Sequence, residues 1–274
     1  MSRTEEAWKI AINEKSYQAL RTIDENTAPL NTPTTSFSSI TQPSDTLFPL
    51  CIDHTLLKPD ATPAQIDTLC DEATRFGFKS CCVNGVYVKQ VAARLQSSTS
   101  IPCAVIGFPL GASTTAVKVF EAKDAISNGA REIDMVINIG LLKTGSSYSA
   151  VFEDVHAVAQ ACQSQGIPLK VILETIFLSD LETVAGAFIA AEAGAAFVKT
   201  CTGFNGGGAT KEDVDLMYRT VRYKKGDVKV KASAGIRSFE KCVEMLRAGA
   251  ERIGTSSGAA IMQNANVSAA SGTY

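Results

Sequence analysis

The sequence predicts an α/β fold in which eight strands alternate with eight helices and close into a barrel. From Cys51 onward, short apolar β-type runs alternate with longer segments that have helical periodicity. Three of the helical segments end in a Gly-Ala step that leads into the next apolar run, at Gly129, Gly194 and Gly249. The length of 274 residues also fits a single α/β barrel. Together these features favour the (β/α)8 pattern.

An open doubly wound sheet is the alternative arrangement of the same elements. Such a sheet usually has fewer strands, and a dinucleotide-binding one carries glycines directly after its first strand. The corresponding segment here, Asp53-His-Thr-Leu-Leu-Lys, contains no glycine. The barrel is therefore the preferred prediction.

Helix signals place the boundaries of the elements. Thr62-Pro63 and Ser179-Asp180 are typical helix starts. The expected strands are 51–56, 78–84, 102–108, 132–139, 169–175, 196–201, 228–233 and 252–255. The expected helices are 63–76, 86–96, 114–128, 148–165, 179–194, 210–223, 238–248 and 257–263.

Residues 1–48 are expected to form an N-terminal extension outside the barrel domain, which spans 49–265. Trp8, Ile12 and Leu20 recur at roughly helical spacing and predict a helix within 1–24. The Ser/Thr/Pro-rich stretch that follows has no charge from Ala28 to Gln42 and is typical of a linker or a surface-draped segment. Residues 266–274 are expected to be a flexible C-terminal tail.

Composition excludes several classes of function. The net charge is −2 and no long basic run is present, which argues against nucleic-acid binding. No apolar run approaches the ~18 residues of a membrane span. The acidic pair Glu5-Glu6 argues against a secretory signal, so we expect a cytoplasmic protein.

The eight cysteines predict buried thiols in a reducing compartment rather than a metal site. None forms a Cys-x-x-Cys pair and neither histidine lies beside one, so ligand clusters are not evident and no metal is expected. The cysteines are Cys51, Cys70, Cys81, Cys82, Cys103, Cys162, Cys201 and Cys242.

In a barrel of this kind, active residues lie at the carboxyl ends of the strands and in the loops that follow. The informative candidates are polar residues inside strands that are otherwise apolar. The positions selected are Asp53 or His54, Asn84, 108–111, Asp134, Asn138, Glu174, Lys199, Lys231 and 254–257.

Two lysines end neighbouring predicted strands, Lys199 and Lys231. Adjacent strands are ~4.8 Å apart, so both amines can enter one pocket. Lowering a lysine pKa from ~10.4 to ~7 requires about 4.6 kcal/mol. A second ammonium ~4 Å away supplies about 4 kcal/mol at an effective dielectric of ~20. The pair therefore predicts a neutral, nucleophilic amine, with any nearby aspartate closer to one lysine than to the other.

Asp134 lies between apolar residues of a predicted strand and is expected to carry protons with the lysines, or else to form a structural ion pair. Asp53 is expected to cap a turn or to hold one of the lysines. The alternative for the lysines themselves is that they point outward, as we expect for Lys170 and Lys229.

Three loops have the glycines and hydroxyl or guanidinium groups that could bind a phosphate. The alternative interpretation is that each is an ordinary flexible Gly/Ser turn. They begin at Thr202, at Ser233 and at Gly254, and the last of them opens the final helix, whose N-terminus favours an anion. The expected phosphate contacts are Gly203, Gly235, Arg237, Gly254, Ser256 and Ser257.

Residues 51–262 resemble deoxyribose-phosphate aldolase in register over every predicted strand. The matching segments are Ile52-Asp-His-Thr-Leu-Leu-Lys-Pro59, Val105-Ile-Gly-Phe-Pro-Leu-Gly111, Glu132-Ile-Asp-Met-Val-Ile-Asn-Ile-Gly140, Leu169-Lys-Val-Ile-Leu-Glu-Thr175, Phe197-Val-Lys-Thr200, Val230-Lys-Ala-Ser233 and Arg252-Ile-Gly-Thr-Ser-Ser257.

The resemblance implies a TIM barrel and a Schiff-base aldolase that uses no metal or other cofactor. It implies reversible cleavage of 2-deoxy-D-ribose 5-phosphate to glyceraldehyde 3-phosphate and acetaldehyde. By the same resemblance, Lys199 is the Schiff-base lysine, and Asp134 and Lys231 are proton donors and acceptors. We expect Asp53 to have a supporting role beside them. We expect a homo-oligomer, with a dimer as the simplest form.

The sequence departs from the pattern of this family at three positions. Cys201 stands where serine is usual, Ala234 where glycine is usual, and Gly85 where proline is common. The alternatives left open are another Schiff-base aldolase or transaldolase, a phosphosugar isomerase with Glu174 as base, and a binding protein without catalysis.

Overall fold

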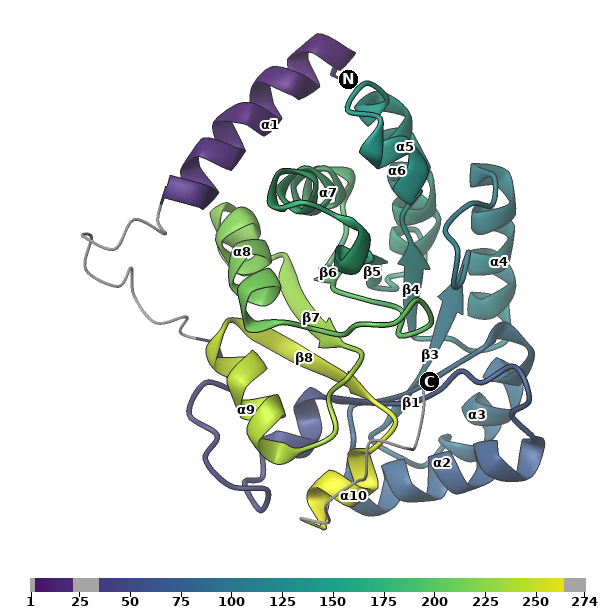
Figure 1. Cartoon of the computed structure of the whole chain (residues 1–274). Coiled ribbons are helices and arrows are strands. Elements are labelled where there is room, and N and C mark those ends of the chain that lie inside the picture. The colour runs from purple at the N-terminus through teal and green to yellow at the C-terminus, as the bar shows by residue number, and fades with distance from the viewer. Residues whose placement is uncertain (1–2, 22–34, 264–274) are drawn as a thin grey trace.

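Eight parallel strands form a closed barrel in sequence order, as the sequence predicts (Figure 1). The computed structural model describes residues 3–21 and 35–263, so the predicted tail 266–274 lies outside the described residues. Pairing of the last strand with the first closes the barrel. The strands are β1 (Ile52–Leu56), β2 (Ser80–Val83), β3 (Ile101–Ile106), β4 (Glu132–Val136), β5 (Leu169–Ile172), β6 (Phe197–Lys199), β7 (Lys229–Ser233) and β8 (Ala250–Thr255).

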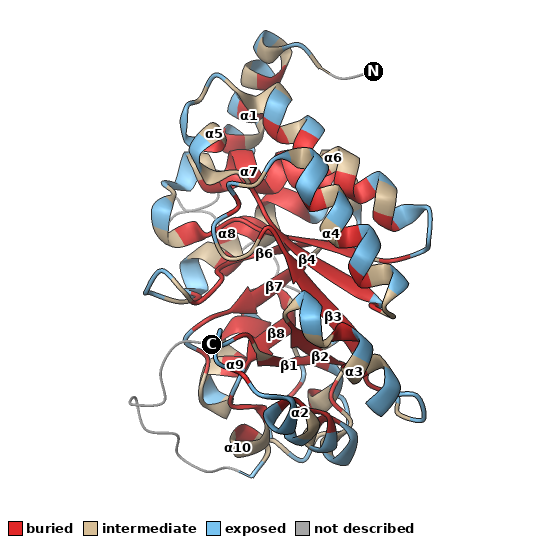
Figure 2. Cartoon of the chain, turned by 90° about the vertical axis from the view of Figure 1, so that its right-hand side faces the viewer, coloured by how far each residue is buried: buried red, intermediate tan, exposed pale blue. Residues whose placement is uncertain are grey.

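Helices follow the strands and cover the outside of the barrel (Figures 1 and 2). They are α2 (Pro63–Phe76), α3 (Val88–Arg94), α4 (Thr115–Ser127), α6 (Tyr148–Gln163), α7 (Asp180–Ala193), α8 (Lys211–Val221), α9 (Phe239–Arg247) and α10 (Gly258–Met262). A short helix that the sequence did not predict, α5 (Ile139–Lys143), follows β4.

Local capping explains where the helices begin. Thr62 and Gln65 form a reciprocal capping box at the start of α2. Ser179 and Glu182 do the same at the start of α7. Gly77 ends α2 in the left-handed conformation, with φ of 73°, which glycine adopts without steric cost.

The N-terminal helix α1 (Glu5–Leu20) packs on α6, α7 and α8. Its Trp8 is buried and contacts the rings of Phe152 and Phe188. The Glu5 carboxylate accepts hydrogen bonds from the backbone amides of Tyr148 and Ser149 and thereby caps α6. The helix expected within 1–24 is therefore present, and it packs against the barrel instead of standing apart from it.

The strands are the most deeply buried part of the chain (Figure 2). Apolar side chains such as Ile133, Met135 and Val171 have no exposed surface and fill the space around the sheet. Because the strands are buried on both faces, a charged side chain on one of them has to find its partners within the protein. In the described residues, no helix is long and apolar enough to cross a membrane.

Candidate active site

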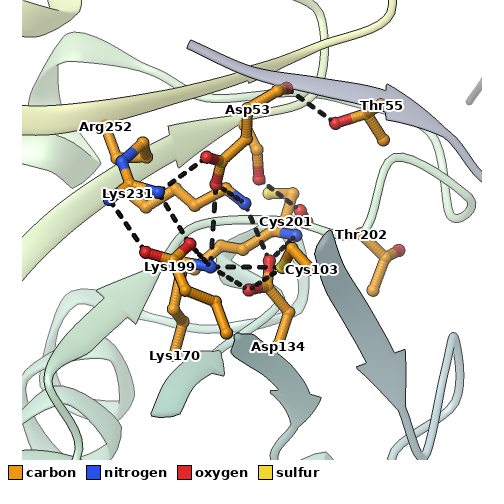
Figure 3. Close-up of polar contacts among 12 residues, drawn as sticks. Asp53, Thr55, Cys103, Asp134, Lys170, Lys199, Cys201, Thr202, Lys231 and Arg252 are labelled. Atoms are coloured by element: carbon orange, nitrogen blue, oxygen red, sulfur yellow. Dashed lines mark hydrogen bonds and ion pairs between the residues drawn. The ribbon is translucent and has the colours of Figure 1, made fainter. Parts of the chain in front are cut away.

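Seven charged side chains gather inside the barrel, and each is at least nine-tenths buried (Figure 3). Some of them are register partners on neighbouring strands: Lys199 pairs with Lys231, and Lys170 pairs with Asp134. They are Asp53 of β1, Glu132 and Asp134 of β4, Lys170 of β5, Lys199 of β6, Lys231 of β7 and Arg252 of β8. This set is called the charge cluster below.

Asp134 is the centre of the charge cluster (Figure 3). One of its oxygens, Oδ1, accepts a hydrogen bond from Lys170 Nζ at 2.6 Å. The other, Oδ2, accepts from Lys199 Nζ at 2.9 Å and from Lys231 Nζ at 2.8 Å. The two lysines predicted from the sequence therefore do meet, at one oxygen of Asp134. The expectation that the aspartate lies closer to one of them is wrong for Asp134, which is nearly equidistant.

Asp53 makes the surroundings of Lys231 differ from those of Lys199, because it pairs with Lys231. Its carboxylate pairs with Lys231 Nζ at 2.5 Å and with Arg252 Nη1 at 2.6 Å, and it accepts a hydrogen bond from Ser80 Oγ at 2.6 Å. Burial alone would raise the pKa of Asp53, but Arg252, Lys231 and Lys170 outweigh it and hold that pKa well below its usual range. Asp53 therefore stays ionised and keeps Lys231 charged.

Lys170 is the residue of the charge cluster whose direction was predicted wrongly, and Glu132 and Arg252 were not foreseen as members. We expected Lys170 to face solvent, but its side chain has no exposed surface. Its Nζ lies 2.7 Å from Glu132 and 2.6 Å from Asp134, with Asp53 at 3.7 Å. Lys170 points inward because it is the register partner of Asp134 on the neighbouring strand, and register partners face the same side of a sheet. Lys229, by contrast, is half-exposed and pairs with Glu251 at 3.4 Å.

The local field keeps most of the charge cluster ionised. Burial would raise the pKa of Asp134, but Lys170, Lys199 and Lys231 hold it well below its usual range. Burial likewise opposes the ammonium form of Lys231, yet Asp134 and Asp53 raise its pKa above the ordinary lysine value. The pKa of Lys170 is raised in the same way, mainly by Asp134 against the effect of burial.

The three lysines of the charge cluster differ in the number of carboxylates that surround them. The charge cluster holds four cationic groups and three carboxylates, so full ionisation leaves one positive charge in excess. In the described part of the chain, Lys170 lies near three carboxylates and Lys231 near two, whereas Lys199 contacts Asp134 alone. Lys199 is therefore the lysine of the charge cluster with the least neutralising negative charge around it.

The segments predicted to hold phosphate lie at the carboxyl ends of β6, β7 and β8 and in the loops that follow. The loops after β6 and β7 touch each other, since Ala209 N donates to Ala234 O at 3.0 Å. Gly203 and Gly235 both have positive φ, 87° and 73°. Thr255 Oγ1 of β8 donates to Ile236 O at 2.7 Å and joins the third loop to the second.

The residues of the third segment, 254–257, differ in burial and in the element to which they belong. Gly254 lies within β8, and a Cβ there would stand 2.8 Å from Ser233 Cβ and 3.1 Å from Lys231 Cε. Glycine at 254 is thus needed to let the Lys231 side chain pass. Ser256 is exposed and Ser257 is mostly buried at the start of α10. Arg237 is half-buried in the second loop.

The three departures from the family pattern have different structural consequences. Ala234 has φ of 78°, a left-handed conformation that is costly for any residue with a Cβ. Cys201 Sγ lies 3.3 Å from Thr175 Oγ1, and burial raises the pKa of this thiol to about 11. At Gly85 a Cβ would meet nothing within 4 Å, so the space there does not require glycine.

Glu174 has a structural task in the loop after β6. It is fully buried, and its two oxygens accept hydrogen bonds from Thr202 N at 3.1 Å, Thr202 Oγ1 at 2.5 Å and Asn205 Nδ2 at 3.0 Å. A carboxylate occupied in this way is poorly placed to abstract a proton from a substrate. The geometry therefore does not favour an isomerase with Glu174 as base.

One potential ligand cluster was not foreseen from cysteine spacing. Cys82 and Cys103 pair across β2 and β3, and their sulfurs lie within 4.8 Å of each other and of an Asp134 oxygen. Cys103 Sγ also donates to Asp134 Oδ1 at 3.2 Å. A cation at this point would face the three ammonium groups around Asp134, whose repulsion opposes its binding.

Comparison with known proteins gives one consistent result. The family model described as DeoC/LacD family aldolase matches residues 48–264. Deoxyribose-phosphate aldolase 1 of Staphylococcus aureus is 56% identical over 212 residues, which are 77% of this chain and 94% of the staphylococcal protein. The aldolase of Staphylococcus haemolyticus is also 56% identical, over 213 residues.

Two solved structures extend the similarity to the N-terminal part of the chain. A Coccidioides immitis protein, named as a candidate deoxyribose-phosphate aldolase, superposes with a TM-score of 0.84 at 40% identity and covers 96% of this chain and 98% of its own. The tetrameric deoxyribose phosphate aldolase of Aeropyrum pernix has a TM-score of 0.74 at 30% identity, with 92% and 96% covered.

Proposed function

Because the chain belongs to the DeoC/LacD family of aldolases, we propose that it cleaves 2-deoxy-D-ribose 5-phosphate through a Schiff base on Lys199. The products are glyceraldehyde 3-phosphate and acetaldehyde, and the reaction is reversible. The observation that carries this proposal is the uneven distribution of carboxylates, which leaves Lys199 as the least neutralised amine of the charge cluster.

The reaction begins with nucleophilic attack by the neutral Lys199 amine on the aldehyde carbon of the open-chain sugar. Loss of water gives a protonated imine, which accepts the electron pair of the C2–C3 bond when the C3 hydroxyl loses its proton. The first product departs with the phosphate. Protonation of the remaining enamine and hydrolysis of the imine then release acetaldehyde and regenerate the amine.

Asp134 and Lys231 are the groups that move protons in this scheme. The Asp134 Oδ2 atom contacts both amines, so it can pass a proton between Lys231 and the atoms bound to Lys199 without large motion. Lys231 remains charged because two carboxylates raise its pKa.

The phosphate is proposed to bind over the loops after β6, β7 and β8. Backbone amides of Gly203, Gly235 and the 254–257 segment, the hydroxyls of Ser256 and Ser257, and the Arg237 guanidinium supply donors of the kind that phosphate requires. Gly254 belongs to this set only through its backbone. No metal or other cofactor enters the proposed steps.

We further propose that the protein works in the cytoplasm as a homodimer. All eight cysteines are buried and unpaired, as is typical of a reducing compartment. Val86, Val117 and Phe120 are exposed on neighbouring elements and offer an apolar surface for self-association. Light scattering of the purified chain and cell fractionation test these two statements.

Reduction of the enzyme with borohydride in the presence of substrate tests the Schiff base directly. We expect a stable adduct on Lys199 in a peptide map and complete loss of turnover in Lys199→Leu. Lys229→Leu is the matched control, because it removes a strand lysine outside the charge cluster and should leave turnover unchanged. An adduct on Lys170 or Lys231, or no adduct at all, would contradict the assignment of the nucleophile.

A further inference from the structure

The side chain of His54 lies on the outer face of β1, opposite to that of its neighbour Asp53. Asp53 points into the charge cluster, and successive residues of a strand face opposite sides, so His54 is directed toward the helices. Its side chain is 2% exposed, and its Nε2 lies 2.6 Å from Glu72 Oε2 of α2. A carboxylate accepts hydrogen bonds, so Nε2 donates and the ring is held in one orientation.

The imidazole fills the space directly under the start of α10. A Cβ built on Gly258, the first residue of that helix, would stand 2.9 Å from His54 Nδ1 and 3.1 Å from the ring of Phe78. The Phe78 and His54 rings contact each other, with centroids 5.0 Å apart. The backbone that leaves the Ser256–Ser257 turn therefore rests on the His54 ring.

Two observations indicate that this contact has a purpose beyond packing. His54 Nδ1 is buried without a hydrogen-bond partner among the described residues, a cost that a leucine at this position would avoid. On one side the turn borders a cavity of about 440 Å³, which is also lined by His54, Glu72, Ser256 and Ser257. His54 lines this cavity and also contacts the start of α10, so the imidazole limits displacement of the turn toward the cavity.

We propose that His54, oriented by Glu72, is a positioning residue that holds the Ser256–Gly258 turn in place for the phosphate group of the substrate. The inference rests on the proposed function, which assigns phosphate binding to this turn. It requires no contact between His54 and the substrate. Its effect belongs to the binding of the phosphate and leaves the chemistry at Lys199 unchanged.

The test compares the phosphorylated sugar with unphosphorylated 2-deoxyribose as substrates of the full-length enzyme. For His54→Leu we expect KM for the phosphorylated sugar to rise about tenfold while kcat stays within about twofold. The value of kcat/KM for 2-deoxyribose should not change. His54→Gln keeps a donor for Glu72 and should recover part of the loss, whereas Glu72→Gln should lose less than His54→Leu.

The only other histidine of the chain provides a matched control. His156 of α6 bonds to Ala193 O and Gln160, away from the loops after the strands, so His156→Leu should leave both substrates unaffected. Gly258→Ala presses a methyl group against the ring and should reproduce the selective rise in KM. Combined with His54→Ala, its effect should be smaller, because one of the two rings it collides with is gone while Phe78 remains.

Equal losses on both substrates, or an unchanged KM in a folded His54→Leu enzyme, would overturn the positioning role. The proposed function fails differently. A wild-type enzyme that does not prefer the phosphorylated sugar would contradict the phosphate site itself, and the role of His54 with it. A strong wild-type preference that survives in His54→Leu would leave the phosphate site intact and refute His54 alone.

Discussion

Lys170 carries a charge in the barrel interior that its neighbours have to neutralise. Its ammonium is fully buried and is stabilised by Glu132 and Asp134 at hydrogen-bonding distance. Replacement by methionine keeps much of the volume but leaves these carboxylates without their shared partner. Removal of one member of a buried ion pair typically costs about 3–5 kcal/mol, and we expect Lys170→Met to lose stability on this order. Urea unfolding followed by circular dichroism measures it.

Lys229 is the control for this prediction, because it is a strand lysine of the same size in the opposite setting. Its side chain is 42% exposed and its pairing distance to Glu251 is 3.4 Å. Exposed pairs of this kind contribute about 0–1 kcal/mol, so Lys229→Met should be nearly neutral. If the two variants were equally stable, the charge cluster would not contribute to stability in the way its geometry implies.

The contrast between these lysines shows what the sequence could and could not predict. Asp134, Lys199 and Lys231 stood out because each interrupts an apolar strand. Lys170 does so as well, but barrel strands are buried on both faces, and the pattern then carries no contrast that tells inside from outside. Only the register with Asp134 resolves its direction. The meeting of Cys82 and Cys103 likewise depends on register, which sequence spacing does not contain.

At the scale of elements, α1 is the part whose role the sequence described least well. Its buried residues Trp8 and Ile12 belong to the same apolar core as Ile40, Phe48 and the strands. Large-to-small replacement of a buried aromatic typically costs about 3–5 kcal/mol. We therefore expect Trp8→Ala to destabilise the whole protein by about that amount in chemical unfolding, with a single transition.

The same variant should retain kcat under conditions where it is folded, because α1 packs on the outer helices and contributes no group to the charge cluster. Ile10→Ala is the control, since this α1 residue is 53% exposed. A separate early transition in Trp8→Ala, with the barrel unaffected, would instead support the prediction of an extension outside the main fold.

The other elements were predictable because their signals are local. Capping residues and terminal glycines located the eight helices after the strands, and short apolar runs located the strands. The helix α5 was missed because its five residues are too few to display helical periodicity. Strand β6 is shorter than expected, with three residues, Phe197–Lys199, where the apolar pattern indicated 196–201. Its end coincides with the proposed nucleophile.

At the scale of the whole molecule, the charge cluster joins strands that are far apart in the chain. Arg252 of β8 binds Asp53 of β1 and Glu132 of β4, and Glu132 continues to Lys170 of β5. The Arg252–Glu132 pair crosses the interior of the barrel from β8 to β4, whereas the other two pairs join neighbouring strands. Protonation of these carboxylates should therefore weaken the closed barrel as a whole. Glu132 is the residue that links Arg252 of β8 to Lys170 of β5.

The stability that Glu132 contributes should depend on pH. Burial would raise the pKa of Glu132, but Lys170 and Arg252 outweigh it and lower that pKa. A lowered folded-state pKa stabilises the protein above the unfolded value of ~4.3, and the contribution is lost as the pH falls through the folded value. Wild type should exceed Glu132→Gln by about 3–5 kcal/mol in unfolding free energy at neutral pH. Below about pH 4 the difference should shrink. Urea unfolding between pH 3 and pH 8 measures it, and a difference that persists or grows in acid would show that Glu132 is not held ionised by its neighbours.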